Sequence, residues 1–211
     1  MQTNFFGPTK IIQSIVPHMR ERKSGTIVNL SSIGGFYSFP GSSVYCASKF
    51  ALEGMPSLRE KSFGARKLAI KKKQKCRLGL SEALQVELSP FNISVLIVEP
   101  GYFRTNFLGG LEGAIKPYSE AYKGTPAGQL LDMCEKMAGK QPGDPPKAVK
   151  AIFDAVAGGP TDRLTGKVVR LPLGSDACKY VEQKLENLKA DFEKTKEVAK
   201  TTDRDDAKLG K

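Results

Sequence analysis

The chain has 211 residues, of which 40% are hydrophobic and 26% charged, a composition that fits a globular domain with a core of its own. No apolar run approaches the ~20 residues of a membrane span, and the N-terminal residues lack the order of a secretion signal. The formal net charge of +11 invites a nucleic-acid partner, but residues 55–79 alone hold nine basic residues and one acidic residue, a net charge of +8.

Apolar periodicity predicts helices and strands that alternate along the chain. Helices are expected at 3–20, 44–54, 80–91, 128–138 and 146–158, the last with Asp144 and Pro145 as its start signal, and from residue 177 onward; strands are expected at 26–32, 93–101 and 166–174. Residues 200–211 read as a frayed tail. This alternation predicts an α/β fold, a doubly wound parallel sheet covered by helices on both faces, in a single domain that spans residues 1–211.

Ligands of such sheets bind beyond the carboxyl ends of the strands. Ser31 and Ser32 follow the first predicted strand, Pro100 and Gly101 end the second, and Tyr45 lies at the head of the helix between them. These segments are therefore expected to converge at one edge of the sheet.

Tyr45 and Lys49 are four residues apart on a predicted helix, so their side chains share one face. Such a pair can be simple surface decoration. Alternatively, a nearby ammonium can lower the pKa of the phenol by ~1–3 units, so that it exchanges a proton with an alcohol or carbonyl oxygen near neutral pH. A serine hydroxyl on the same oxygen would stabilise developing charge. The carbon then needs a hydride, which a nicotinamide cofactor supplies.

Several segments together resemble the short-chain dehydrogenase/reductase family. They are "QTNFFG", "GTIVNLSS", "YCASKFALEG" and "LSEALQVELSPFNISVLIVEPGYFRT", which begin at residues 2, 25, 45 and 80. The family's usual gap between its serine and its tyrosine selects Ser32 rather than Ser31. The resemblance covers nearly the whole chain and implies a Rossmann-like fold.

The resemblance also implies a role for each matching residue. Tyr45 would be the acid/base, Lys49 would lower its pKa and bond the cofactor ribose, and Ser32 would position the substrate oxygen. The implied cofactor is NAD(P), with NADP favoured, although no residue of this sequence indicates a preference for NAD or NADP. The residues expected around it are Asn4, Tyr45, Lys49, Pro100, Gly101, Phe103 and Thr105.

Two of these positions keep an alternative. Asn4 matches the family's asparagine that holds a proton-relay water, but it also fits an ordinary polar position on a helix. Thr105 would lie near the carboxamide or phosphate of the cofactor, but it also fits the N-cap of a following helix.

One family feature is missing from the sequence. The family begins with a strand, a glycine-rich turn and a helix that holds the pyrophosphate. No such motif occurs, so the chain is expected to be a truncated form that contains the catalytic half of the fold. Strand 26–32 would then be an exposed sheet edge, and the chain alone would bind the dinucleotide weakly or not at all.

Residues 55–79 form a second departure, a basic insertion between segments that would otherwise make one helix. Few apolar positions and many like charges predict a looped-out segment. It could be a patch for nucleic acid or an acidic membrane. The favoured interpretation is translated non-coding sequence, such as a retained intron, because the flanks rejoin as family sequence.

The sequence therefore predicts a cytoplasmic NAD(P)-dependent oxidoreductase that interconverts an alcohol and a ketone or aldehyde. The expected partner is a small-molecule substrate, without nucleic acid, membrane or metal. The family is commonly homo-oligomeric, although the insertion could prevent this. The alternatives are a non-catalytic remnant and a basic binding module. The four cysteines lack metal-like spacing and are interpreted as free thiols. Residues 106–143 are expected to choose the substrate. Their aromatic residues Phe107, Tyr118 and Tyr122 suit either an apolar substrate or a packed core.

Overall fold

The computed structural model of the chain describes residues 1–54, 80–109, 119–158, 164–202 and 204. The basic segment 55–79 and most of the predicted tail 200–211 lie outside the described residues, as does Tyr118. The predictions for them stay predictions.

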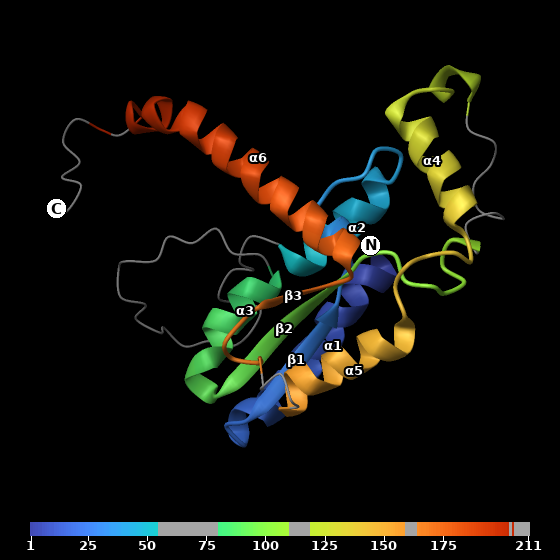
Figure 1. The fold of residues 1–211 in the computed structure, drawn as a ribbon. Helices are drawn as coiled ribbons and strands as arrows, with labels where there is room; N and C mark the ends of the chain where they lie inside the picture. The colour runs from blue at the N-terminus through green and yellow to red at the C-terminus, as the bar shows by residue number, and fades with distance from the viewer. Residues whose placement is uncertain (55–79, 110–118, 159–163, 203, 205–211) are drawn as a thin grey trace.

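Helices and strands alternate along the chain as the periodicity predicts (Figure 1). The helices are η1 (Gln2–Phe6), α1 (Gly7–Glu21), η2 (Ile33–Gly35), α2 (Ser43–Glu53), α3 (Leu80–Leu88), η3 (Ser89–Phe91), η5 (Glu120–Tyr122), α4 (Pro126–Met137), α5 (Pro145–Ala157) and α6 (Ser175–Lys200). The strands are β1 (Gly25–Leu30), β2 (Ile93–Pro100) and β3 (Arg170–Leu173).

The three strands form a parallel sheet in the order β1-β2-β3. Gly25 pairs with Ile93 at one end of the first ladder and Leu30 with Val98 at the other, so the carboxyl ends of β1 and β2 lie at the same edge. β3 is shorter than predicted, because its pairing with β2 begins at Arg170; just before it, the carbonyl of Val169 accepts from the N–H of Ile97, and Thr165 and Val168 form an isolated bridge. In the described sheet β1 is an edge strand, as expected.

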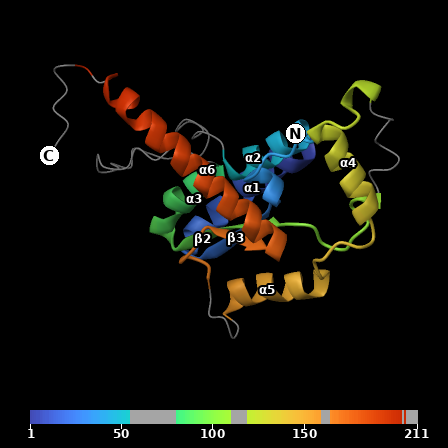
Figure 2. The same cartoon turned by 45° about the horizontal axis from the view of Figure 1, so that its top comes forward.

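Both faces of the sheet are covered, which confirms the doubly wound arrangement (Figure 2). Ile93 and Val95 of β2 point towards α1 and α3, whereas Leu96 and Val98 pack against α5. This alternation follows from the period of two along a strand, and explains why the central run Val95–Val98 of β2 is apolar on both faces.

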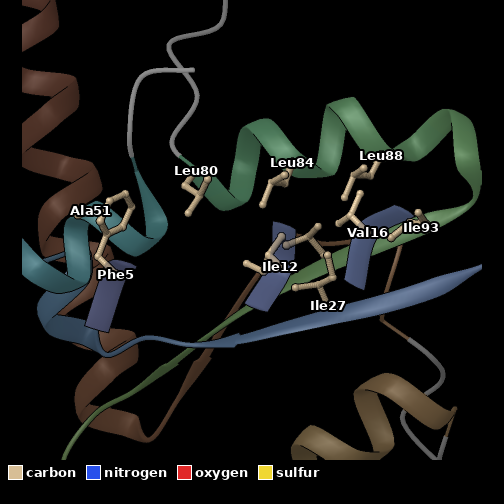
Figure 3. Packing of buried hydrophobic residues seen from close by; sticks show 10 residues of the cluster. Phe5, Ile12, Val16, Ile27, Ala51, Leu80, Leu84, Leu88 and Ile93 are labelled. Carbon is tan, nitrogen blue, oxygen red and sulfur yellow. The ribbon is translucent and has the colours of Figure 1, made fainter. Parts of the chain in front are cut away.

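The larger core lies between the sheet, α1 and α3 (Figure 3). Ile12 and Val16 come from one stripe of α1, and Leu84 and Leu88 come from one stripe of α3. Each fully buried side chain of this size stabilises the fold by ~1.5–3 kcal/mol. The cluster consists of Phe5, Ile12, Val16, Ile27, Ala51, Leu80, Leu84, Leu88, Ile93 and Val95.

Local capping explains several helix starts. Asp144 caps α5 by accepting a hydrogen bond from the backbone N–H of Lys147 at 3.3 Å, and Pro145 occupies the first turn. Thr125 caps α4 in the same way, through the N–H of Gly128. None of the described helices combines the length and the apolar composition that crossing a bilayer requires.

Candidate active site

The loop after β1 carries the candidate substrate-binding serine. The ladder with β2 continues one residue past the strand, where the N–H of Ser31 donates to the carbonyl of Val98 at 2.8 Å. Ser32 then caps the short helix η2, and its Oγ accepts a hydrogen bond from the N–H of Gly34 at 3.1 Å. The serine is thereby fixed at the carboxyl edge of the sheet.

Tyr45 meets Ser32 over a glycine. A Cβ on Gly34 would lie 3.1 Å from a ring carbon of Tyr45 and 3.5 Å from the Oγ of Ser32, so a larger residue there would crowd both side chains. The neighbouring Ser32 hydroxyl lowers the pKa of the Tyr45 phenol. The structure therefore brings together the serine and the tyrosine that the sequence singled out.

Burial is nevertheless the largest influence on Tyr45 and raises the pKa of its phenol above the ordinary value. The direction is opposite to the one expected from the sequence. The hydroxyl of Tyr45 is therefore protonated at neutral pH in this arrangement.

Lys49 lies one turn after Tyr45 on α2, but the hydrogen bond of its ammonium goes to the end of β1. Its Nζ donates to the carbonyl oxygen of Leu30, the last residue of β1, at 3.2 Å. Burial lowers the pKa of Lys49, and the carboxylate of Glu53 opposes that shift. The lysine thus ties α2 to the end of β1, and the proposed effect on Tyr45 remains a prediction.

Asn4 reaches the site through a residue that the sequence analysis did not select. Its Nδ2 donates to the Oγ of Ser48 at 3.0 Å, and this hydroxyl donates to the carbonyl of Tyr45 at 2.7 Å. The asparagine thereby joins η1 to the turn of α2 that carries the tyrosine. The signal for Ser48 was available, because a serine three residues after Tyr45 lies on the same helix face.

The segment after β2 lies at the same edge. The N–H of Gly101 donates to the carbonyl of Leu173 at 2.9 Å, and a Cβ on Gly101 would overlap the carboxylate of Asp176. Thr105 lies in a turn, where its Oγ1 accepts from the N–H of Phe107 at 3.3 Å. Both of its sequence alternatives stay predictions, because residues 110–118 lie outside the described part of the chain.

Phe107 brings this segment to the tyrosine. Its ring centroid lies 5.9 Å from that of Tyr45. Phe107 is 56% exposed and Tyr122 is 55% exposed, so a packed core does not account for these two aromatic residues. The loop after β2 thus offers an apolar wall beside the hydroxyl pair.

An arginine paired with three carboxylates lies next to the serine loop of the site. The sequence patterns did not predict this group of charges. Glu53 of α2 accepts from the Oγ of Ser31 at 2.5 Å, and its other oxygen lies 2.5 Å from Nη1 of Arg170. Arg170 also pairs with Glu99 of β2, and with Glu82 of α3 at 3.0 Å. We call these five residues the Arg170 cluster.

Burial makes the Arg170 cluster electrostatically unusual. Glu53 and Glu99 are each 1% exposed, and one oxygen of Glu99 accepts no hydrogen bond from the described residues. Burial and the neighbouring Glu53 raise the pKa of Glu99 to about 7, against the attraction of Arg170. Ser31 lies next to Ser32, and Glu53 lies one turn after Lys49 on α2. The cluster therefore fixes the end of β1 against α2, close to both site residues.

Four aromatic rings line the same edge of the sheet. Tyr37 and Phe39 follow β1, Tyr102 follows β2, and Tyr180 comes from α6. The ring of Tyr180 lies 4.9 Å from that of Tyr37 and 5.0 Å from that of Phe39. The root of α6 is thereby fixed against the loop that carries Ser32.

A parallel sheet covered on both faces, with a serine and a tyrosine paired at its carboxyl edge, defines a Rossmann-like α/β protein. The family described as short chain dehydrogenase matches residues 1–72. A short-chain dehydrogenase from Streptomyces avermitilis superimposes with a TM-score of 0.64 at 35% identity, over 94% of this chain and 60% of that chain. The chain belongs to the short-chain dehydrogenase family.

Curated relatives agree with this assignment. Oxidoreductase calM of Penicillium decumbens is 32% identical over 204 residues, which cover 94% of this chain and 57% of that protein. The 3-ketodihydrosphingosine reductase of Bacteroides thetaiotaomicron is 35% identical over 127 residues, or 58% of this chain and 38% of that protein. The chain thus spans about half the length of the curated relatives it matches.

Proposed function

We propose that the protein is an NAD(P)-dependent oxidoreductase that interconverts an alcohol and a ketone or aldehyde. The observation that carries the proposal is the pair of side chains of Ser32 and Tyr45, which lie side by side around Gly34 at the carboxyl edge of the sheet. Membership of a family of oxidoreductases supports it.

In the reduction direction, a hydride adds to the carbonyl carbon and a proton must reach the carbonyl oxygen. Tyr45 would give that proton from its phenol, and the neighbouring Ser32, which lowers the pKa of that phenol against the effect of burial, would favour the transfer. Ser32 would donate a hydrogen bond to the same oxygen and stabilise its developing charge. Phe107, against the ring of Tyr45, would cover the apolar part of the substrate.

The described residues fit the nicotinamide end of the cofactor, which supplies the hydride when it is bound. Tyr45 and Lys49 offer a phenol and an ammonium one helical turn apart, which suits two ribose hydroxyls. Pro100, Gly101, Phe103 and Thr105 would flank the nicotinamide, and Asn4 would hold the turn of α2. A neighbour from Burkholderia cenocepacia was solved in complex with NADP; at 18% identity and a TM-score of 0.53 its likeness establishes the fold.

The cytoplasm remains our proposed compartment. Cys46, Cys134 and Cys178 are free thiols in the part of the chain that the structure describes, which suits a reducing environment.

Reduction of a panel of aliphatic and aromatic ketones by the 211-residue chain, with NADPH or NADH at millimolar concentration, tests this proposal. We expect Tyr45→Phe to lower the rate by about 10²–10⁴-fold, the contribution of a positioned acid. Phe153→Leu, at an aromatic side chain of α5 that is 66% exposed and outside the site segments, is the control and should keep the wild-type rate.

Two results would overturn the proposal. If Tyr45→Phe keeps the wild-type rate, the assigned roles are wrong. If no ketone is reduced, the non-catalytic alternative is favoured, and the bond between Lys49 and Leu30 in place of a contact with Tyr45 is the observation that agrees with it.

A further inference from the structure

The outer part of α6 carries an apolar stripe that the rest of the described chain leaves open. The helix is rooted by the buried Ala177 and by the ring of Tyr180, and from there it projects away from the sheet (Figures 1 and 2). Leu185, Leu188 and Phe192 are 54%, 48% and 61% exposed. Apolar residues this exposed, aligned on one helix face, indicate a surface for a partner.

The stripe has the spacing of a coiled coil. Its members alternate between three and four residues apart, which is the seven-residue repeat that lets two helices pack along one seam. We call this set the α6 seam; it consists of Cys178, Val181, Leu185, Leu188, Phe192, Thr195 and Ala199.

The charges that flank the seam decide which partner fits it. Between Ser175 and Lys200 the helix carries six basic and six acidic residues, so it has no net attraction to an anionic lipid surface. Glu182 and Lys189 lie on one side of the seam, and Lys184 and Asp191 lie on the other. Among the described residues these four make no ion pair, so both signs are free on each side of the seam.

We propose that the α6 seam binds the same seam of a second copy of this chain, in antiparallel orientation. One register places Phe192 opposite Val181 of the second copy and Leu185 opposite its Leu188. The flanking positions of that register then face opposite charges on both sides: Lys184 meets Asp191 of the second copy, and Glu182 meets its Lys189. Two-fold symmetry repeats each pair, which gives four attractive pairs.

The parallel arrangement is less favourable. In parallel coiled coils a flanking residue meets the one five positions further along the partner helix. Lys184 would then face Lys189 of the second copy and repel it twice, and Asp191 would attract Lys196 twice, so these pairs cancel instead of giving four attractive pairs. The antiparallel pair also places the two globular bodies at opposite ends of the helices.

The antiparallel overlap runs from Cys178 to Thr195, which is about five turns or ~27 Å of helix. An interface of this length lies at the small end of specific contacts, so the dimer should be weak and reversible. Sedimentation equilibrium of the full chain between about 1 and 200 µM is therefore the experiment. We expect monomer at the low end of this range and dimer at the high end.

Substitutions on α6 identify the surface and its direction. Phe192→Glu should abolish the dimer, with circular dichroism confirming that the chain is folded. Lys184→Asp should weaken the dimer tenfold or more, since two like-charged pairs with Asp191 appear; adding Asp191→Lys should restore it. Lys194→Asp, on the outer face of the helix, is the matched control and should leave the dimer unchanged.

Other results would overturn the proposal. A chain that is monomeric at 200 µM has no such contact, and a dimer that survives Phe192→Glu uses another surface. A dimer that Lys184→Asp strengthens is parallel. A further outcome is a chain that does not dimerise but sediments with phosphatidylserine-containing vesicles. If Phe192→Glu abolishes that sedimentation, the seam binds a lipid surface instead. None of these readouts depends on the proposed enzyme activity.

Discussion

At the scale of single residues, the Arg170 cluster is the most unusual feature of the described chain. Arg170 neutralises only part of the charge of Glu53, Glu82 and Glu99, and two of these carboxylates are almost fully buried. Buried charges are costly when they are incompletely paired. The pKa of Glu99 is raised to about 7. Protonation of Glu99 removes one negative charge from the cluster and so lowers the cost of burying it.

The pKa of Glu99 predicts how stability depends on pH. Its pKa in the folded chain is about 7, above the ordinary value of 4.5, so the folded state binds the proton more tightly than the unfolded state. The corresponding stability is present below pH ~4.5 and is lost as the pH rises through ~7. We expect the free energy of unfolding in urea to fall by on the order of 3 kcal/mol across this range.

Substitution isolates this contribution of Glu99. Glu99→Gln keeps an oxygen for Arg170 but removes the titration, so most of the loss between pH 5 and pH 8 should disappear. Glu120→Gln, at an exposed carboxylate paired with Lys123, is the control and should leave the pH profile unchanged. A Glu99→Gln profile as steep as the wild type would show that another group titrates.

At the scale of elements, α2 and α3 meet as if they were one helix. The Oγ of Ser81 donates to the carbonyl of Leu52 at 2.8 Å and accepts from the Nδ2 of Asn29 at 2.9 Å. Removal of the 25 residues 55–79 would leave Ser81 four positions after Leu52. A hydroxyl bonded to a carbonyl four residues earlier is a common helix contact, which Thr9 makes with Phe5 in this chain.

We therefore predict that deletion of residues 55–79 leaves the fold intact and raises the midpoint of thermal unfolding by several degrees. The reason is that a long loop no longer has to be closed when α2 joins α3, and that a like-charged segment is lost. Thermal circular dichroism measures both the helix content and the midpoint. Deletion of the shorter α4 segment 128–138 is a contrasting control, expected to reduce helix content. A deletion variant of 55–79 that loses helix would show that the segment is part of the fold.

At the scale of the whole molecule, the described part of the site centres on the hydroxyl pair. Pyrophosphates bind at open helix N-termini that follow glycine-rich turns. The helices α4 and α5 are instead capped by Thr125 and Asp144, whose side chains already accept hydrogen bonds from the first turn. In α6 the first turn carries Asp176, which repels an anion.

We accordingly predict that the chain binds NADPH weakly, with a Kd near or above ~1 mM, while the substrate edge of the site is in place. Titration followed by the fluorescence of NADPH measures this directly. Tyr45→Phe provides the baseline for binding outside the site. A micromolar Kd that Tyr45→Phe weakens would contradict the prediction and would reveal a phosphate site among the remaining residues.

Much of the fold could be predicted because its signals are local. The apolar periods of residues 3–20 and 93–101 placed α1 and β2, and Asp144 with Pro145 placed the start of α5. Strand ends and helix heads meet at one edge of a parallel sheet, which pointed to Ser31, Ser32 and Tyr45, and the family resemblance then selected Ser32 and Tyr45. β3 was predicted too long, because its ladder with β2 begins only at Arg170, although β2 extends back to Ile93, and an apolar run does not encode where the pairing of two strands begins.

The sequence by itself thus determined the order of elements, the family and the pair of hydroxyls at the sheet edge, because these depend on residues close together in the chain or on a fixed topology. Only the tertiary structure decided the environment of charges. The Arg170 cluster gathers residues from α2, α3, β2 and β3, and the ammonium of Lys49 bonds Leu30, nineteen residues away in the chain. Such contacts follow from packing and burial, which no periodicity encodes.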